Sequence, residues 1–122
     1  MNNRINYMAT LCCMLFLSFT FAADVILSID GQTLNYTSIE DIAGWQFSHD
    51  GCATSASGGD SADAGFTISA SPSVVLAFSF SGSSIPAGSG ILVDLGSSDC
   101  NENSLSGFVF SGVGGNVLSS EL

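Results

Sequence analysis

The chain has 122 residues, with 11 Asp and Glu, one Lys or Arg, and a formal net charge of −10 at pH 7. This length indicates a single domain. The only cation, Arg4, lies in a segment that we expect to be removed. The remaining chain therefore lacks the Lys and Arg side chains that bind nucleic-acid phosphates or anionic membranes. Enzymes that hold a phosphate or carboxylate with Lys or Arg are excluded for the same reason.

Residues 1–22 have the pattern of a cleaved secretory signal peptide. A short polar segment carries Arg4, an apolar run covers residues 11–21, and small residues follow at Ala22 and Ala23. The run is too short for the ~20 apolar residues that a transmembrane anchor needs. We expect cleavage after Ala22, which leaves residues 23–122 as a single exported domain, secreted or, in a bacterial host, periplasmic.

The rest of the chain predicts strands throughout. Short alternations of apolar and polar residues are separated by turns rich in Gly, Ser, Asn and Asp. A return strand at residues 33–37, a Gly-rich turn at 57–60 and a last strand at 116–118 complete the pattern. We expect an all-β antiparallel sandwich of about seven to nine strands. The alternating apolar sets are Val25, Leu27 and Ile29; Ala43, Trp45 and Phe47; Phe66 and Ile68; Val74, Leu76, Phe78 and Phe80; Ile91, Val93 and Leu95; and Phe108 and Phe110.

Two cysteines, Cys52 and Cys100, remain after the expected cleavage. In an oxidising compartment such a pair most simply forms one disulfide. A loop of about 48 residues closed in this way is worth about 4 kcal/mol of stability in the chain-entropy treatment. The alternative is a reactive or metal-binding thiol pair, but no Cys-x-x-Cys spacing supports it, and His49 is the only histidine.

Four segments resemble a known family. Residues 42–47, 64–69, 75–80 and 85–92 read IAGWQF, AGFTIS, VLAFSF and IPAGSGIL. They are similar to the strands of cohesin-like and carbohydrate-binding-module-like extracellular β-sandwiches, and the resemblance covers roughly Asp41–Leu95. The resemblance implies a jelly-roll sandwich in a non-catalytic extracellular module that binds dockerin-type partners or related ligands.

The sequence gives little support for a catalytic site. His49-Asp50 has no G-x-S-x-G elbow to accompany it, so we expect Asp50-Gly51 to form a turn with His49 partly exposed beside it. Glu40 and Asp41 are adjacent and would point to opposite faces of a strand. A glycosidase needs two carboxylates across a cleft. We therefore predict that the protein is not an enzyme.

Calcium is the one cofactor that the sequence suggests. Asp94, Asp99, Asn101 and Glu102 cluster around Cys100, and carboxylate and amide oxygens are calcium ligands. Asp60 and Asp63 form a second group. Neither group has the spacing of an EF-hand, and the alternative is an acidic surface that keeps the protein in solution.

Two further positions bear on ligands. Asn35-Tyr36-Thr37 is an N-glycosylation acceptor if the host is a eukaryote. Trp45 and Tyr36 are the non-phenylalanine aromatics outside the signal peptide. Trp45 alternates in phase with Phe47, so we expect it in the core rather than on a glycan-binding platform.

These observations favour binding over catalysis. We expect a secreted binding or adhesion module with a protein or glycan partner. The alternative is a structural or assembly subunit of an extracellular matrix or filament, with self-association that depends on calcium. A third, less favoured alternative is a small hydrolase that loses turnover on His49→Ala. Sheets often protect their edges with Lys, and the exported chain has none. Either Asp, Pro86 and Gly bulges protect the edges instead, or an edge is left open to strand addition, which favours the assembly alternative.

Overall fold

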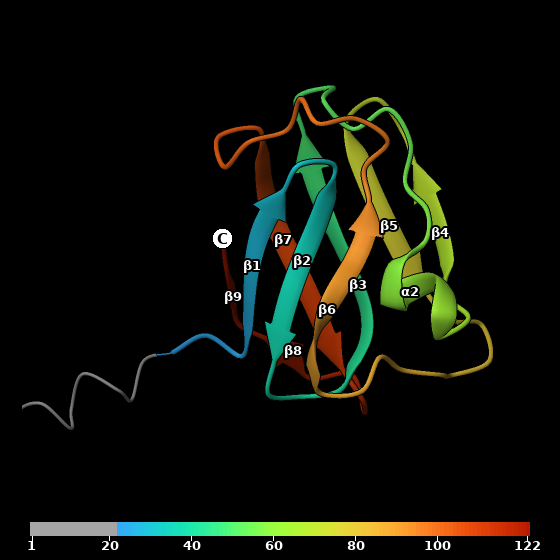
Figure 1. Cartoon of the computed structure of the whole chain (residues 1–122). Helices are drawn as coiled ribbons and strands as arrows, with labels where there is room; N and C mark the ends of the chain where they lie inside the picture. Colours follow the sequence, from blue (N-terminus) through green and yellow to red (C-terminus); the bar gives the residue numbers. More distant parts are fainter. Residues whose placement is uncertain (1–21) are drawn as a thin grey trace, which may run out of the picture.

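The computed structural model describes residues 22–122, which form two packed β-sheets and one short helix (Figure 1). The predicted signal peptide, residues 1–22, therefore lies outside the described residues except for Ala22. The elements are β1 Val25–Asp30, β2 Thr33–Ser38, β3 Ile42–His49, α2 Gly59–Asp63, β4 Thr67–Ala70, β5 Val74–Phe78, β6 Gly88–Asp94, β7 Leu105–Gly112, β8 Val117–Leu118 and β9 Ser120–Glu121.

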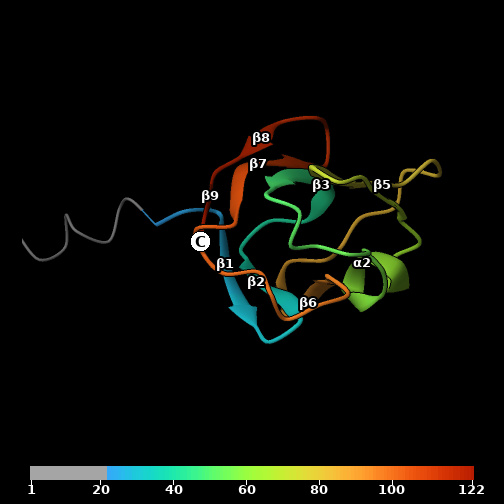
Figure 2. The ribbon, with the colours of Figure 1, turned by 90° about the horizontal axis from the view of Figure 1, so that it is seen from above.

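One sheet has four strands in the order β6-β2-β1-β9, and the other has five in the order β4-β5-β3-β7-β8. Neighbouring strands are antiparallel except β1 and β9, which are parallel. Seen from above, the sheets form two layers, and α2 lies on the side where β6 and β5 diverge (Figure 2). The prediction of an antiparallel sandwich with about seven to nine strands and one disulfide is confirmed.

The core between the sheets is built around aromatic side chains of β3 and β7. Trp45 and Phe47 alternate on the inner face of β3, as predicted, and their rings stack at a centroid distance of 5.6 Å. The ring of Phe47 contacts the ring of Phe108 in β7 at a centroid distance of 5.1 Å. Phe110 of the same strand is fully buried. The opposing sheet contributes aliphatic side chains, so the two layers fill one continuous core.

The most regular alternation in the sequence faces outward. On β5 the buried residues are Val75 and Ala77, whereas Val74 and Leu76 are exposed. Val75 and Ala77 pair with Phe47 and Trp45 across the sheet. Small side chains on β5 therefore leave room for the large rings of β3, and close packing selects this set for the core.

Bulges interrupt simple alternation in three of the strands. Val93 pairs with Leu34 and Ile91 with Asn35, so Leu92 is an extra residue in β6. Both Leu92 and Val93 are buried as a result, and Ile91 turns outward, although alternation predicted that it shares a face with Val93. A second bulge lies in β7 at a glycine with φ of +64°. A third lies between Ile42 and Gly44 of β3, where Ile42 is fully buried and the predicted core residue Ala43 is only half-buried.

The predicted turn at residues 57–60 contains the start of helix α2. Two hydrogen bonds between side chains fix the helix to the sheets: the Trp45 Nε1–H donates to Ser61 Oγ at 2.9 Å, and the Tyr36 hydroxyl donates to Asp60 Oδ2 at 2.6 Å. The helix also needs glycine at Gly59, because its φ is +66° and a Cβ added there would lie 2.6 Å from the Leu92 carbonyl oxygen. Five residues are too few for a helical period in the sequence, which explains why the prediction missed it.

The docking of α2 predicts that Gly59→Ala is much more destabilising than Gly58→Ala. Both positions have positive φ, which costs alanine about 1 kcal/mol or more. A Cβ at Gly58 meets no atom within 4 Å, whereas at Gly59 it meets the backbone of β6. We expect an additional loss of about 2 kcal/mol for Gly59→Ala, or a further drop in Tm of about 8 °C or more, measured by Trp45 fluorescence. Equal melting temperatures for the two variants would contradict this account.

Candidate protein-binding face

The outer face of the five-stranded sheet, which points away from the other sheet, carries no charge. Gln46 of β3 lies between Leu76 of β5 and Val109 of β7, and the next row along the strands places Gly44 between Phe78 and Ser111. Leu76 and Val109 are 37% and 43% exposed. We name this surface the outer face and define it by these six residues. Large apolar side chains grouped on a surface are more informative than an isolated exposed leucine.

A shallow hollow of about 270 Å³ lies at the centre of this face, bounded by all six residues. It exists because Gly44 has no side chain between Phe78 and Ser111. The backbone of Gly44 does not require glycine, since its φ is not in the left-handed region and an added Cβ would make an ordinary contact of 3.4 Å with the Ala77 carbonyl oxygen. Alanine would therefore fit and would partly fill the hollow.

An aromatic pair extends the apolar surface beyond the end of β5. Phe80 is 82% exposed and contacts the ring of Phe78 edge-on at a centroid distance of 4.7 Å. The loop that presents it is held by Ser79 Oγ, which accepts hydrogen bonds from the backbone N–H groups of Ser81 and Ser83. Ser83 Oγ donates in turn to the Ala64 carbonyl oxygen at 2.7 Å. Phe80 is thus exposed on an ordered loop, and such pre-organisation reduces the entropy lost on binding.

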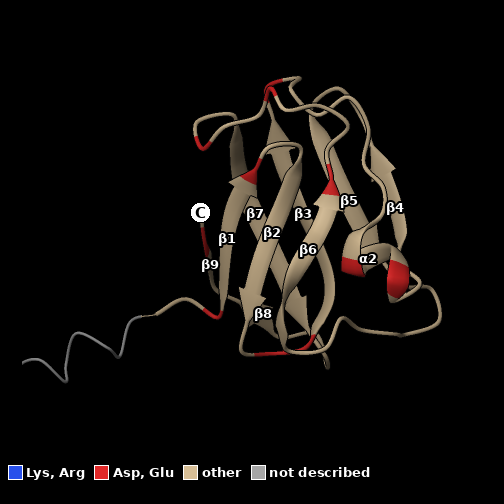
Figure 3. Ribbon diagram, in the orientation of Figure 1, with Lys and Arg blue, Asp and Glu red and all other residues tan. Residues whose placement is uncertain are grey.

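The carboxylates lie elsewhere. Figure 3 shows Asp and Glu confined to loops, strand ends, α2 and β9. No Asp or Glu occurs within β3, β4, β5, β7 or β8, whereas strands of the other sheet contain Asp30, Asp94 and Glu121. The outer face is therefore an uncharged surface on a protein whose loops are strongly acidic.

The residues predicted to bind calcium are spread along one segment. Asp94 ends β6, where its Oδ1 accepts hydrogen bonds from the Gly96 N–H and the Gln32 side chain, and these bonds lower the pKa of Asp94. Asn101 Oδ1 accepts a hydrogen bond from the Asn103 N–H, while Asp99 and Glu102 are exposed. Within residues 22–122 no three His, Cys, Asp or Glu side chains are grouped so that they could hold a metal ion. Calcium binding stays a prediction.

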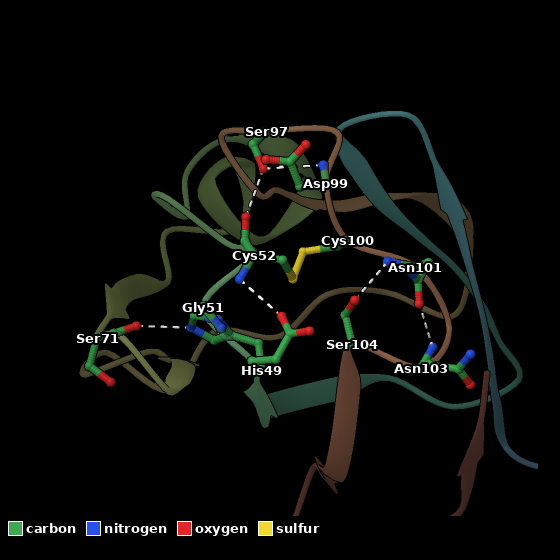
Figure 4. The surroundings of a disulfide bond; sticks show 11 residues. His49, Gly51, Cys52, Ser71, Ser97, Asp99, Cys100, Asn101, Asn103 and Ser104 are labelled. Carbon is green, nitrogen blue, oxygen red and sulfur yellow. Dashed lines mark hydrogen bonds between the residues drawn. A yellow bond between two sulfur atoms is a disulfide. The ribbon is translucent and has the colours of Figure 1, made fainter.

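The disulfide and His49 lie together at one end of the sandwich (Figure 4). Cys52 and Cys100 are bonded, as predicted, and join the segment after β3 to the segment before β7. His49 is buried rather than partly exposed. Its Nδ1 accepts a hydrogen bond from the Gly51 N–H, so Nε2 carries the proton and donates to the Ser71 carbonyl oxygen at 2.9 Å. Both ring nitrogens are thus bonded to backbone, an arrangement that fixes the loop and leaves neither nitrogen directed at a serine hydroxyl.

The remaining predicted positions lie on β2 of the four-stranded sheet and on β3 of the five-stranded sheet. Asn35 is half-buried on β2, and its Oδ1 accepts a hydrogen bond from the Thr33 hydroxyl. Trp45 is 3% exposed, which confirms its predicted place in the core, and Tyr36 is 5% exposed. Neither ring offers a face for stacking on a sugar.

The sequence reasoning missed the outer face as a site. The signal was present in the alternation Val74, Leu76, Phe78 and Phe80, but period-2 alternation identifies residues that share a face and does not say which face is buried. The pairing of β5 with β3 places Val75 and Ala77 on the inner side of the sheet, so this set points to solvent.

Comparison of the chain with protein-family models, with curated proteins and with solved structures finds no match in any of the three. In the described part of the chain, no helix has the length and apolar character needed to cross a membrane.

The environment of Tyr36 predicts that its hydroxyl ionises only at unusually high pH. Burial raises the pKa of its hydroxyl above the ordinary value of 10.0, and the hydrogen bond to the Asp60 carboxylate and its negative charge raise it further. Because the folded pKa is raised, this contribution to stability is present below about pH 10 and is lost as the pH rises beyond it.

A chain that begins at residue 23 has Tyr36 as its only tyrosine, so absorbance at about 295 nm reports its phenolate alone. We expect no phenolate at about pH 11 while Trp45 fluorescence stays native. Asp60→Asn should lower the pH at which the phenolate first forms, whereas Asp63→Asn on the same helix should leave that pH unchanged. A phenolate midpoint near 10 in the folded wild type would contradict the prediction.

Proposed function

We propose that the protein is a secreted, non-catalytic binding module and that its outer face holds a protein partner. The observation that carries this proposal is the apolar group around the hollow at Gly44, in which Leu76 and Val109 are exposed and Phe78 is half-buried. The strands of this sheet contain no Asp, Glu, Lys or Arg. Depletion of charge with enrichment of aromatic and aliphatic groups distinguishes the centre of protein interfaces. The signal-peptide pattern and the resemblance to cohesin-like modules agree with an exported binding role.

A protein partner fits this surface better than a glycan. Sugar-binding surfaces usually use the exposed faces of Trp or Tyr, and the only Trp and Tyr among the described residues are 3% and 5% exposed. Phe80 with Phe78 offers an anchor of the kind that enters a pocket on another protein. We therefore propose that the partner supplies apolar side chains to the hollow and a pocket for Phe80.

The alternative is a structural or assembly subunit, in which a second copy covers the outer face. The same apolar surface supports it, and eleven carboxylates on each copy oppose it at low salt. Association of this kind strengthens as salt is added, because salt screens the repulsion.

A pair of matched variants tests the proposed function. Leu76→Asp places a carboxylate on the outer face, and Ile91→Asp places one on the outer side of the four-stranded sheet at a similar exposure, 37% against 42%. Each exported protein is immobilised and titrated with the secreted protein fraction of the source organism. We expect saturable binding to wild type and to Ile91→Asp, and a loss of at least tenfold for Leu76→Asp.

Gly44→Ala is the control for the case in which Leu76→Asp loses binding because it does not fold. Alanine should leave stability unchanged or raise it by about 0.5 kcal/mol, because glycine is unfavourable inside a strand. It should still weaken binding by partly filling the hollow. Equal losses for Leu76→Asp and Ile91→Asp, or unaltered binding by both Leu76→Asp and Gly44→Ala, would overturn the proposal.

A further inference from the structure

The free edge of β4 has backbone groups available for another strand. Ser71 N–H donates to the Val74 carbonyl oxygen and closes the turn between β4 and β5. Hydrogen-bonded and non-hydrogen-bonded pairs alternate along an antiparallel ladder, so the N–H and C=O groups of Ile68 and Ala70 point away from β5. The same parity directs the Phe66 N–H outward, and there it donates to the Ser61 carbonyl oxygen. Within residues 22–122 no backbone partner is found for the outward groups of Ile68 and Ala70.

The other edges of the sandwich are protected. The edge of β6 is covered by the chain leading into α2, through the bridge between Ser57 and Asp94 and the contact of Gly59 with Leu92. β7 carries a bulge at Gly107, and β1 and β9 each end in a carboxylate. Among the described strands of four or more residues at a sheet edge, β4 alone has no charge, proline, glycine, bulge or covering segment. In Figure 1 it forms the rim of the molecule.

Charge identifies the kind of strand that fits this edge. Residues 22–122 contain eleven carboxylates and no Lys or Arg. Asp63 lies four residues before β4, and Asp50 follows His49, whose ring holds the Ser71 carbonyl oxygen just beyond β4. One carboxylate therefore precedes this uncharged strand in the chain, and another follows the histidine that holds the segment after it. A second copy would bring its own eleven carboxylates to this edge, whereas a cationic strand is attracted to it.

We propose that the edge of β4 receives an extended segment of a cationic protein partner, which adds as a sixth strand to the five-stranded sheet. Ile68 and Ala70 supply up to four backbone hydrogen bonds. Alternate side chains of the added strand lie beside Thr67 and Ser69, on the same side of the sheet as the outer face, and Lys or Arg at its ends approaches Asp63 and Asp50. This inference rests on the proposed function, because it names the chemistry of the partner that covers the outer face.

The probe is a nine-residue peptide with the centre Thr-Val-Thr-Val-Thr and two Lys at each end, compared with the same peptide ending in Glu. The exported protein, labelled with nitrogen-15, is titrated while the amide shifts are followed. We expect the Lys peptide to move the Ile68 and Ala70 amides and to bind at least tenfold more tightly at about 50 mM salt than at about 500 mM. The Glu peptide should not bind.

Ala70→Pro and Ala70→Val form the matched pair. Proline removes the outward N–H and is tolerated at an edge position whose N–H does not donate to β5, whereas valine keeps the N–H. We expect at least a tenfold loss of peptide affinity for Ala70→Pro and none for Ala70→Val, with Trp45 fluorescence confirming that both variants fold.

Three outcomes would overturn the inference. They are equal binding to both Ala70 variants, binding of the Glu peptide as tight as that of the Lys peptide, or no amide shift with either peptide. Growth of dimers with rising salt, with shifts at Ile68 and Ala70 in the absence of peptide, would assign the edge to a second copy instead. Each result leaves the proposed function to be decided separately by Leu76→Asp.

Discussion

The eleven carboxylates of residues 22–122 have no Lys or Arg to neutralise them, and the rest of the architecture depends on where they lie. An unpaired carboxylate inside a protein is strongly unfavourable, and several close together repel one another. Loops and strand ends keep them hydrated and apart, which is the distribution in Figure 3. Because the carboxylates are placed there, the strands of the five-stranded sheet contain no Asp or Glu.

Asp60 shows how a half-buried carboxylate is accommodated without a cation. Its Oδ2 accepts a hydrogen bond from the Tyr36 hydroxyl, and it lies so close to Gly90 that any Cβ there would meet it at 2.5 Å. Hydrogen bonds to a charged acceptor are stronger than those between neutral groups. The second link, from Trp45 to Ser61, is also a hydrogen bond between side chains. Hydrogen bonds from a hydroxyl and an indole donor, rather than ion pairs, thus hold α2 over the open side of the sandwich.

Most of the fold could be predicted from the sequence because alternation and turn residues act locally. The strand around Val25, Leu27 and Ile29, its return strand, and the pairing of Cys52 with Cys100 were all predicted. The side to which β5 faces could not be predicted, because both of its alternating sets are apolar. The choice depends on volume: the smaller set, Ala77 and Val75, lies beside the rings of Trp45 and Phe47. That information belongs to residues about 30 positions away in the chain.

The extra residue in β6 and the positive φ in β7 were unpredictable for a related reason. A bulge adds one residue to a ladder and exchanges the inner and outer sets beyond it, so Ile91 is exposed although it alternates with Val93. The candidate binding face was hidden in the same way. Its residues were visible in the alternation of β5, but their exposure follows from pairing with β3.

The separation of charge from the outer face has a consequence for binding. A partner that covers Leu76, Phe78 and Val109 removes apolar groups from water without removing any carboxylate, so association there carries no large penalty for desolvating charge. The carboxylates at the strand ends stay hydrated and act over a distance. Exposed ion pairs add little affinity, but a field of one sign steers an oppositely charged protein toward the surface and raises its rate of association. Contacts with the neutral sheet then determine how long the complex lasts, and the acidic loops determine how often it forms.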